Sequence, residues 1–271
     1  MNQKWSERFR IMLIVILFII FLISAGVLTT TLVRSSNEQS AFETLAQEVA
    51  PKEQAQQAEN PLEGYQNLKA RNGDFSGWLS LEGTKLSYPV MYTPGDPQYY
   101  LRRDFEKQNS LSGTPFIDGE SSSTDANVLI HGHNMKNGTM FNALMQYEDE
   151  QFWTSHPVIQ FNTPFSLGDY QILGVFVTKI SGDPAKDAFP YYEYAHITEE
   201  VQFQAYVAKV KEIALYETGV NAVYGDQLLT LSTCDNVTDD GRLVVVAVKA
   251  GGRSDLQQSA AELVKKEQKK R

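Results

Sequence analysis

The feature that most constrains this chain is an uncharged run of 23 residues, Ile11–Val33, close to its N-terminus. As an α-helix, a run of this length extends for roughly 35 Å, which is enough to cross a bilayer with some tilt. Three basic residues and one acidic residue precede it, so the positive-inside rule places residues 1–10 in the cytoplasm. We therefore predict a single-pass anchor over residues 11–33 that contacts membrane lipid, with the body of the chain outside the cell.

A cleaved signal peptide is the alternative interpretation of the same run. The run is longer than the apolar region of a typical signal peptide, which is about 7–15 residues. Its nearest small-residue cleavage site, Ser24–Gly26, lies inside the apolar run instead of after it. These two observations favour the anchor.

The rest of the chain divides by composition into three parts. Residues 34–60 are polar and rich in Gln, Glu, Ser and Ala, which indicates an extracellular stalk with a short helix over Ala41–Val49 that ends before Pro51. Residues 61–254 form the globular part, and residues 255–271 form a charged tail that we interpret as a solvated chain end. After residue 34 the chain has 20 basic and 32 acidic residues, and this acidic balance argues against nucleic acid as a partner.

Short segments of strand character dominate the globular part. They are separated by turns rich in Gly, Pro, Asn and Asp, and many short strands in one body predict a barrel or a sandwich. A helix of about twenty residues interrupts them, with Thr198 as its N-cap and Gly219 at its end. The predicted strands are Gly77–Leu81, Lys85–Val90, Pro115–Asp118, Asn127–Ile130, Val158–Asn162, Asp169–Ile180, Gln227–Thr233 and Arg242–Ala250.

Cys234 is the only cysteine of the chain, so an intramolecular disulfide is excluded. It follows an apolar strand in the sequence QLLTLSTCD, and a side chain at a strand end is held by a rigid element and can face a cleft. A buried structural cysteine is the alternative, but the polar segment Ser232–Asp235 is unlike a core sequence. We therefore predict that Cys234 is a nucleophile.

A cysteine nucleophile requires a proton acceptor or an imidazolium partner, because the thiolate is the reactive form. Of the four histidines, His156 lies in a Ser-His-Pro turn, where a surface position is expected. His196 lies just before a helix, where a structural role is expected. His131 and His133 follow the predicted strand Asn127–Ile130, at the opening of a loop. One of these two is the expected partner of Cys234.

Arg242 is the candidate for stabilising charge on the attacked carbonyl. It opens a strand directly after the turn Asp239–Gly241, and a hairpin with the preceding strand would bring it near Cys234. Ser232 and Thr233 flank the cysteine and are candidates for contact with the substrate backbone. Local hydrogen bonding at the strand end explains these two hydroxyl residues equally well.

Taken together, GHNMKNGTMF, TLSTC and the arginine that follows resemble a class B sortase. The resemblance covers nearly the whole chain and implies a mainly β fold. The fold would be a closed eight-stranded β-barrel with an N-terminal helical extension and a long helix before the strand that carries the cysteine. The resemblance also assigns the family's catalytic histidine, cysteine and arginine to His133, Cys234 and Arg242.

The resemblance further implies transpeptidation without a metal or cofactor. Cys234 would cleave a C-terminal sorting signal of the Asn-Pro-x-Thr-Gly kind in secreted proteins, and the thioacyl enzyme would pass the acyl group to a peptidoglycan amine. His133 would give a proton to the leaving amine and later take one from the incoming amine.

Other functions stay open at this stage. A pilin-polymerising sortase would use the same residues on another acceptor, and a thiol hydrolase would use water. A metal hydrolase would use His131 and His133 as ligands, since residues at i and i+2 of an extended segment point the same way. A non-catalytic extracellular barrel that binds the cell wall would not need Cys234 at all.

Overall fold

The computed structural model describes residues 2–50, 60–181, 183–234 and 241–251, with the side chains of residues 2–8 and 234 left out. The predicted tail over 255–271, residues 51–59 of the predicted stalk and the turn residues Asp239 and Asp240 lie outside this range. The chain forms two units, residues 1–41 and 42–271.

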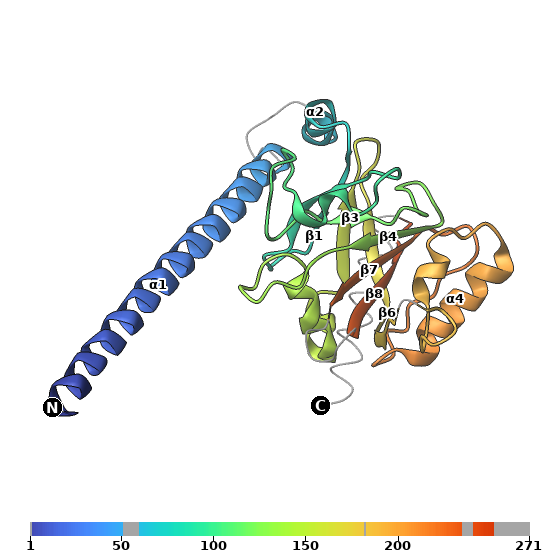
Figure 1. Cartoon of the computed structure of the whole chain (residues 1–271). Helices are drawn as coiled ribbons and strands as arrows, with labels where there is room; N and C mark the ends of the chain where they lie inside the picture. The colour runs from blue at the N-terminus through green and yellow to red at the C-terminus, as the bar shows by residue number, and fades with distance from the viewer. Residues whose placement is uncertain (1, 51–59, 182, 235–240, 252–271) are drawn as a thin grey trace. The chain divides into compact units, whose positions relative to one another are not determined.

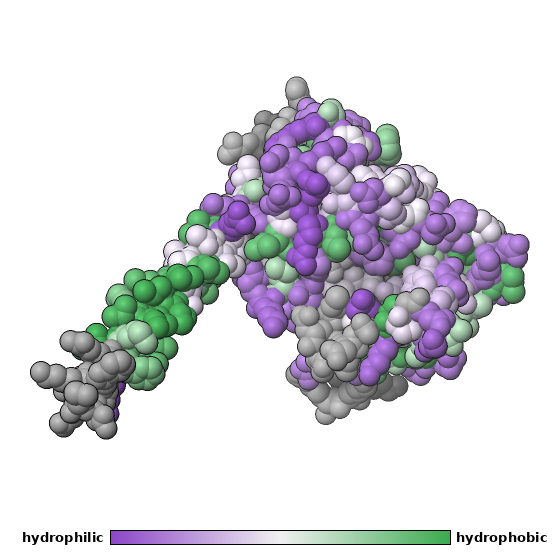
Figure 2. Space-filling view, viewed as in Figure 1, coloured by the Kyte–Doolittle hydropathy of each residue, from purple (hydrophilic) through white to green (hydrophobic). Residues whose placement is uncertain are grey.

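The first unit consists of most of helix α1, Asn2–Val49 (Figure 1). Within this helix, Phe9–Val49 contains a stretch that is apolar and long enough to cross a membrane. The apolar side chains between Phe9 and Val33 are exposed, and they form the hydrophobic surface along α1 in Figure 2. A helix that is apolar on all sides and unburied is typical of a membrane span or a signal sequence.

The second unit contains a closed β-barrel of eight strands in the order β1-β2-β3-β4-β7-β8-β6-β5. The pairs β2–β3 and β4–β7 are parallel and the others are antiparallel. This closed barrel is the architecture that the resemblance to the sortases implied. The strands are β1 Phe75–Ser80, β2 Ser87–Met91, β3 Phe116–Ile117, β4 Asn127–His131, β5 Val158–Asn162, β6 Asp169–Lys179, β7 Leu228–Cys234 and β8 Gly241–Lys249.

Strands β4, β7 and β8 are buried on both faces, which explains their almost continuous apolar sequences. Alternate residues such as Leu231 and Val245 fill the barrel interior. The residues between them, such as Val244 and Val246, form a second cluster outside the barrel, beneath helix α4, Glu200–Ile213. This double burial holds the strands that end at the candidate site firmly in place. The remaining helical segments are α2 Glu63–Arg71, η1 Tyr99–Arg102, η2 Phe141–Glu148, α3 Glu150–Ser155 and η3 Tyr191–Tyr194.

Helix α4 is shorter than the sequence predicts, and the prediction was wrong at both ends. Its N-cap is Glu199 instead of Thr198. It stops at Ile213, well before Gly219, because the backbone N–H of Leu215 donates to the carbonyl of Val175 on β6. A tertiary contact therefore ends the helix before the glycine signal is reached.

The last turns of α1 belong to the barrel unit. Phe42 and Leu45, which the sequence assigns to the stalk, are 2% and 5% exposed in the main core. The ring of Phe42 meets the ring of Tyr88 edge to face, with centroids 5.3 Å apart. Arg71 of α2 donates to Glu48 at 3.1 Å. The segment Phe42–Val49 is thus part of the folded body and not only a spacer.

Candidate active site

The predicted catalytic residues lie at or directly after the ends of three neighbouring strands, β4, β7 and β8. Cys234, the last residue of β7, is the register partner of Arg242 on β8. In the parallel pair, His131 on β4 is the partner of Ser232, and the N–H of Gly132 continues the ladder to the Ser232 carbonyl at 3.2 Å. His133 lies two residues after His131, in the loop that follows β4, and Cys234 lies two residues after Ser232, at the end of β7. Residues about a hundred positions apart in sequence are therefore neighbours in the sheet.

His133 lies half-buried in a loop that starts directly after β4. Its Nε2 lies 3.1 Å from the carbonyl of Leu101, so this nitrogen carries the donated proton. Burial lowers the pKa of His133, and the nearby charge of Arg102 lowers it further against the opposing effect of the Leu101 carbonyl. A protonated His133 is for this reason a stronger acid than an ordinary imidazolium, which suits proton donation to a leaving amine.

The histidine loop, residues 133–141, closes on itself. The N–H of Phe141 donates to the carbonyl of His133 at 2.9 Å, and Asn134 forms a β-bridge with Met140. At Gly132, a Cβ would lie only 2.7 Å from the buried ring of Phe141. Glycine is thus required before His133 because the loop folds back tightly over an aromatic ring.

The Leu101 carbonyl that holds His133 is positioned by η1, which sequence reasoning missed. Buried Tyr100 anchors this segment, since its hydroxyl donates to Asp74 at 2.9 Å. Gly113 approaches from the other side with φ +62°, and a Cβ there would lie 2.4 Å from the Leu101 oxygen. A glycine in the turn SGTP was the only sequence signal for this close approach.

We expect Gly113→Ala to displace the Leu101 carbonyl and disturb His133. The left-handed backbone and the clash together should cost about 1–3 kcal/mol of unfolding free energy, measured by urea denaturation. The pH profile of turnover should also shift, because the environment of His133 changes. Gly95→Ala is the matched control, because a Cβ at Gly95 meets nothing within 4 Å. Equal stability and equal pH profiles for the two variants would contradict this account.

Arg242 is half-buried at the start of β8, and its Nη1 donates to the Gly241 carbonyl at 2.8 Å. Among the residues that the structure describes, no carboxylate forms an ion pair with it. A guanidinium offers five donors in a fixed fork, a geometry that suits it to hold an oxygen atom of another group. On β6, Thr178 is its register partner on the side away from Cys234.

The two hydroxyl residues before the cysteine are both 2% exposed. The Ser232 hydroxyl lies 2.5 Å from the hydroxyl of Tyr191 on η3, and the Thr233 hydroxyl has no partner within the described part of the chain. The Ser232 hydroxyl is therefore hydrogen-bonded to Tyr191 in this structure. Contact of Ser232 and Thr233 with a substrate stays a prediction.

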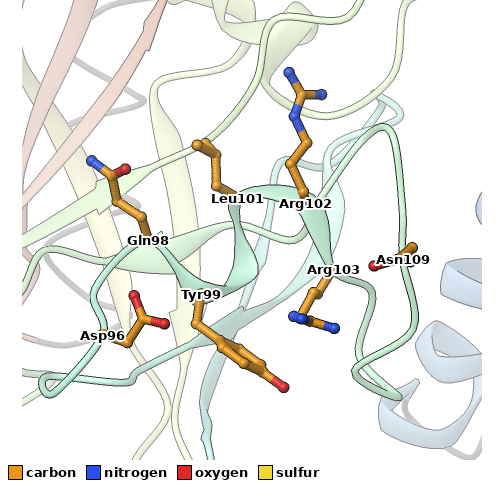
Figure 3. Close-up of a pocket in the computed structure, with 7 residues that line it drawn as sticks. All are labelled: Asp96, Gln98, Tyr99, Leu101, Arg102, Arg103 and Asn109. Carbon is orange, nitrogen blue, oxygen red and sulfur yellow. The ribbon is translucent and has the colours of Figure 1, made fainter.

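An open pocket of about 300 Å³ lies over η1, beside the carbonyl that holds His133 (Figure 3). The guanidinium of Arg103 lies 4.6 Å from the centre of the Tyr99 ring, and both side chains line the pocket. The lining residues are Asp96, Gln98, Tyr99, Leu101, Arg102, Arg103 and Asn109. The same short segment thus lines a pocket and holds the histidine.

Comparison with known proteins identifies the chain. The sortase domain family matches residues 79–250. Sortase B of Listeria monocytogenes is 31% identical over 183 residues, covering 66% of this chain and 71% of that protein. The chain is a class B sortase. The Staphylococcus aureus sortase B-substrate complex superposes with a TM-score of 0.69 at 26% identity, over 80% of this chain and 98% of that one. A sortase B complexed with triglycine superposes with the same TM-score, identity and coverage.

This sortase is accordingly a cysteine transpeptidase that attaches proteins to the cell wall. Its barrel, its long α4 before the cysteine strand and its N-terminal helix agree with the fold that the sequence resemblance implied. His156, in the Ser-His-Pro turn, has a local structural role. Its ring hydrogen-bonds the carbonyl of Phe152, four residues earlier in the chain.

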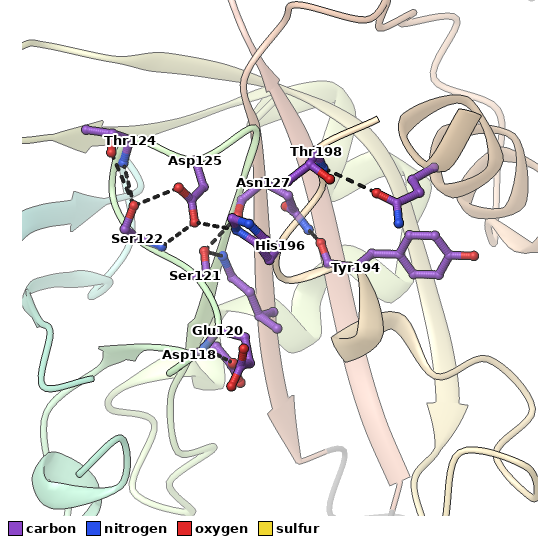
Figure 4. Close-up of polar contacts among 12 residues, drawn as sticks. Asp118, Glu120, Ser121, Ser122, Thr124, Asp125, Asn127, Tyr194, His196 and Thr198 are labelled. Atoms are coloured by element: carbon purple, nitrogen blue, oxygen red, sulfur yellow. Dashed lines mark hydrogen bonds and ion pairs between the residues drawn. The ribbon is translucent and has the colours of Figure 1, made fainter. Parts of the chain in front are cut away.

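Two further histidines of the sortase have partners that explain them structurally. His131 Nε2 lies 2.9 Å from Asp118. Burial raises the pKa of Asp118, but the hydrogen bonds from His131 and from the backbone N–H of Glu120, together with the charge of His131, leave that pKa below its usual value. His196 pairs with Asp125 at 3.4 Å near the start of β4, within the polar cluster of Figure 4. In the described residues no three metal-binding side chains converge, and His131 and His133 face different partners. This geometry gives no support to a metal hydrolase with His131 and His133 as ligands.

Proposed function

We propose that Cys234, His133 and Arg242 form the catalytic set of this sortase. The observation that supports the proposal is that β4, β7 and β8 are neighbouring strands, with Cys234 paired to Arg242 and His133 in the loop directly after β4.

The proposed substrate is a secreted protein with a C-terminal signal of the Asn-Pro-x-Thr-Gly kind. The Cys234 thiolate attacks the threonine carbonyl carbon, and the guanidinium of Arg242 holds the oxyanion that forms. The Thr–Gly C–N bond breaks, and His133 gives its proton to the leaving amine. The product is a thioester between Cys234 and the threonine.

In the second half-reaction an amine of the peptidoglycan precursor attacks the thioester carbonyl. His133 takes the proton of this amine, the C–S bond breaks, and Cys234 returns as a thiolate. The relatives solved with a substrate and with triglycine support a sorting peptide and a glycine amine as the two partners. Neither half-reaction requires a metal or a cofactor.

We further propose that residues 11–33 of α1 anchor the enzyme in the membrane, with residues 1–10 in the cytoplasm and residues 61–254 outside. The apolar character of this helix and the basic residues before it support the orientation. The mass of the protein extracted from membranes tests the anchor. Loss of the N-terminal residues would show cleavage of a signal peptide instead.

The test of the catalytic proposal is intact-protein mass spectrometry of the full chain in detergent, with a panel of sorting peptides. We expect a mass increase equal to the acyl fragment, which peptide mapping places on Cys234. Triglycine should release this fragment as a peptide with three added glycines. Peptide binding without an adduct would instead favour the non-catalytic barrel, and release by water alone would favour a hydrolase.

We expect Arg242→Ala to lower kcat/KM by about 10²–10³, the usual effect of removing one oxyanion donor. Arg242→Lys keeps the charge but loses the planar fork, so it should restore only part of the activity. Lys249→Ala, at the far end of the same strand, is the matched control and should leave turnover unchanged. Steady-state cleavage of a quenched fluorescent sorting peptide measures all three. Full activity of Arg242→Ala would remove Arg242 from the catalytic set.

A further inference from the structure

The histidine loop contains one residue in an unusual backbone conformation. Met140 has φ +56°, a region that is strained for a non-glycine residue, and it is 2% exposed. The next N–H, that of Phe141, bonds the carbonyl of His133. The backbone direction at Met140 therefore determines where the start of the loop, and with it His133, is held.

Tyr88 on β2 holds Met140 in this conformation. The N–H of Met140 donates to the Tyr88 hydroxyl at 3.0 Å, and both residues are buried. The loop also has hydrogen bonds between its own residues, such as the one from the N–H of Gly138 to the carbonyl of Met135. The bond to Tyr88 instead ties the loop to the rigid barrel wall.

The ring of Tyr88 is in turn fixed by α1. Phe42 meets it edge to face at 5.3 Å and 89°, a favoured geometry for aromatic pairs. Phe42 lies in the same helix as the apolar run that ends at Val33. A continuous set of contacts thus runs from Phe42 through Tyr88 and Met140 to His133.

We propose that Tyr88 is a positioning residue for His133, and that the end of α1 acts on the histidine loop through Phe42. The proposal rests on the catalytic role of His133 proposed above. Without the hydroxyl, the Met140 N–H is buried and unpaired, and the left-handed backbone loses its compensation. The loop then relaxes toward an ordinary conformation and moves the imidazole away from its working position.

The test compares Tyr88→Phe with Tyr170→Phe in the full chain in detergent. Tyr170 is similarly buried, and its hydroxyl donates to Gln227 at 2.9 Å at the opposite end of the barrel. We expect Tyr88→Phe to lower kcat about tenfold with KM unchanged, the fold-change expected for one lost hydrogen bond. Tyr170→Phe should keep the wild-type kcat, and thermal unfolding of both variants verifies that they are folded.

A second readout does not depend on turnover. Diethyl pyrocarbonate modifies exposed neutral histidines, and peptide mass spectrometry reports the rate for each of the four. We expect His133 to react several-fold faster in Tyr88→Phe, with His196 unchanged as the internal reference. This measurement separates the two proposals, because it reads the loop even if His133 proves to have no catalytic role.

Phe42→Ala tests the contribution of α1. We expect the same pattern as for Tyr88→Phe with a smaller loss of kcat, and Phe42→Leu controls for the loss of apolar volume. Because both residues act through one contact chain, the double variant should lose little more than Tyr88→Phe alone. Wild-type kcat and His133 reactivity in Tyr88→Phe, or fully additive effects of the two changes, would overturn the proposal.

Discussion

The full chain carrying Cys234→Ala is expected to form no acyl adduct and to cleave sorting peptides only at the background rate. The loss should be about 10⁴-fold or more, because removal of a covalent nucleophile eliminates the thioester route entirely. Intact-protein mass spectrometry and a fluorescent peptide assay measure the adduct and the rate. Since the sequence contains no other cysteine, no second thiol can substitute.

Two controls make this result specific. Cys234→Ser keeps the side-chain volume and a hydroxyl, but its oxygen remains protonated and should react almost as poorly as alanine. Thermal unfolding of both variants should match the wild type. A residual rate above a few per cent in either variant would mean that bond cleavage does not depend on this thiol.

His133→Ala is expected to lower kcat by about 10²–10⁴, the range for loss of a general acid and base. The wild-type pH profile should be bell-shaped, because activity requires one group protonated and one deprotonated. Burial lowers the pKa of His133, so its limb should lie below the ordinary imidazole value of about 6.5. The profile of His133→Ala should retain only one limb.

The assignment to His133 instead of His131 has its own test. His131→Asn can still bond Asp118 and should keep activity within about tenfold, since a single side-chain hydrogen bond is worth about 1 kcal/mol. His196→Ala, at the far end of β4, should behave like the wild type. If His131→Asn were as impaired as His133→Ala, the second histidine would also belong to the catalytic set.

Much of the fold was predictable because the local patterns are strong. The uncharged run Ile11–Val33 has the composition of an apolar helix and forms one, and strand β5 has the bounds that its sequence predicts. The strand end at Cys234 and the strand start at Arg242 were also clear, so their pairing followed from a short hairpin. The family resemblance supplied the closure of the strands into a barrel.

Contacts between distant segments could not be predicted from the sequence. The Leu101 carbonyl that holds His133 is a backbone atom, which leaves no side-chain signal. The Tyr191–Ser232 bond and the packing of Phe42 on Tyr88 join residues about 40 positions apart, and no local period encodes them. The helix end at Ile213 was misjudged for the same reason, because a partner on β6 determined it.

The parallel pairing of β4 with β7 has a consequence for how the enzyme becomes active. The two strands are separated by about a hundred residues, and β5, β6 and α4 lie between them in the sequence. Pairings between such distant segments form slowly, after the local hairpins. Until β4 and β7 pair, the thiol of Cys234 is therefore without its proposed histidine partner. The proposed catalytic set is complete only when nearly the whole barrel has closed, so the enzyme becomes active late in folding.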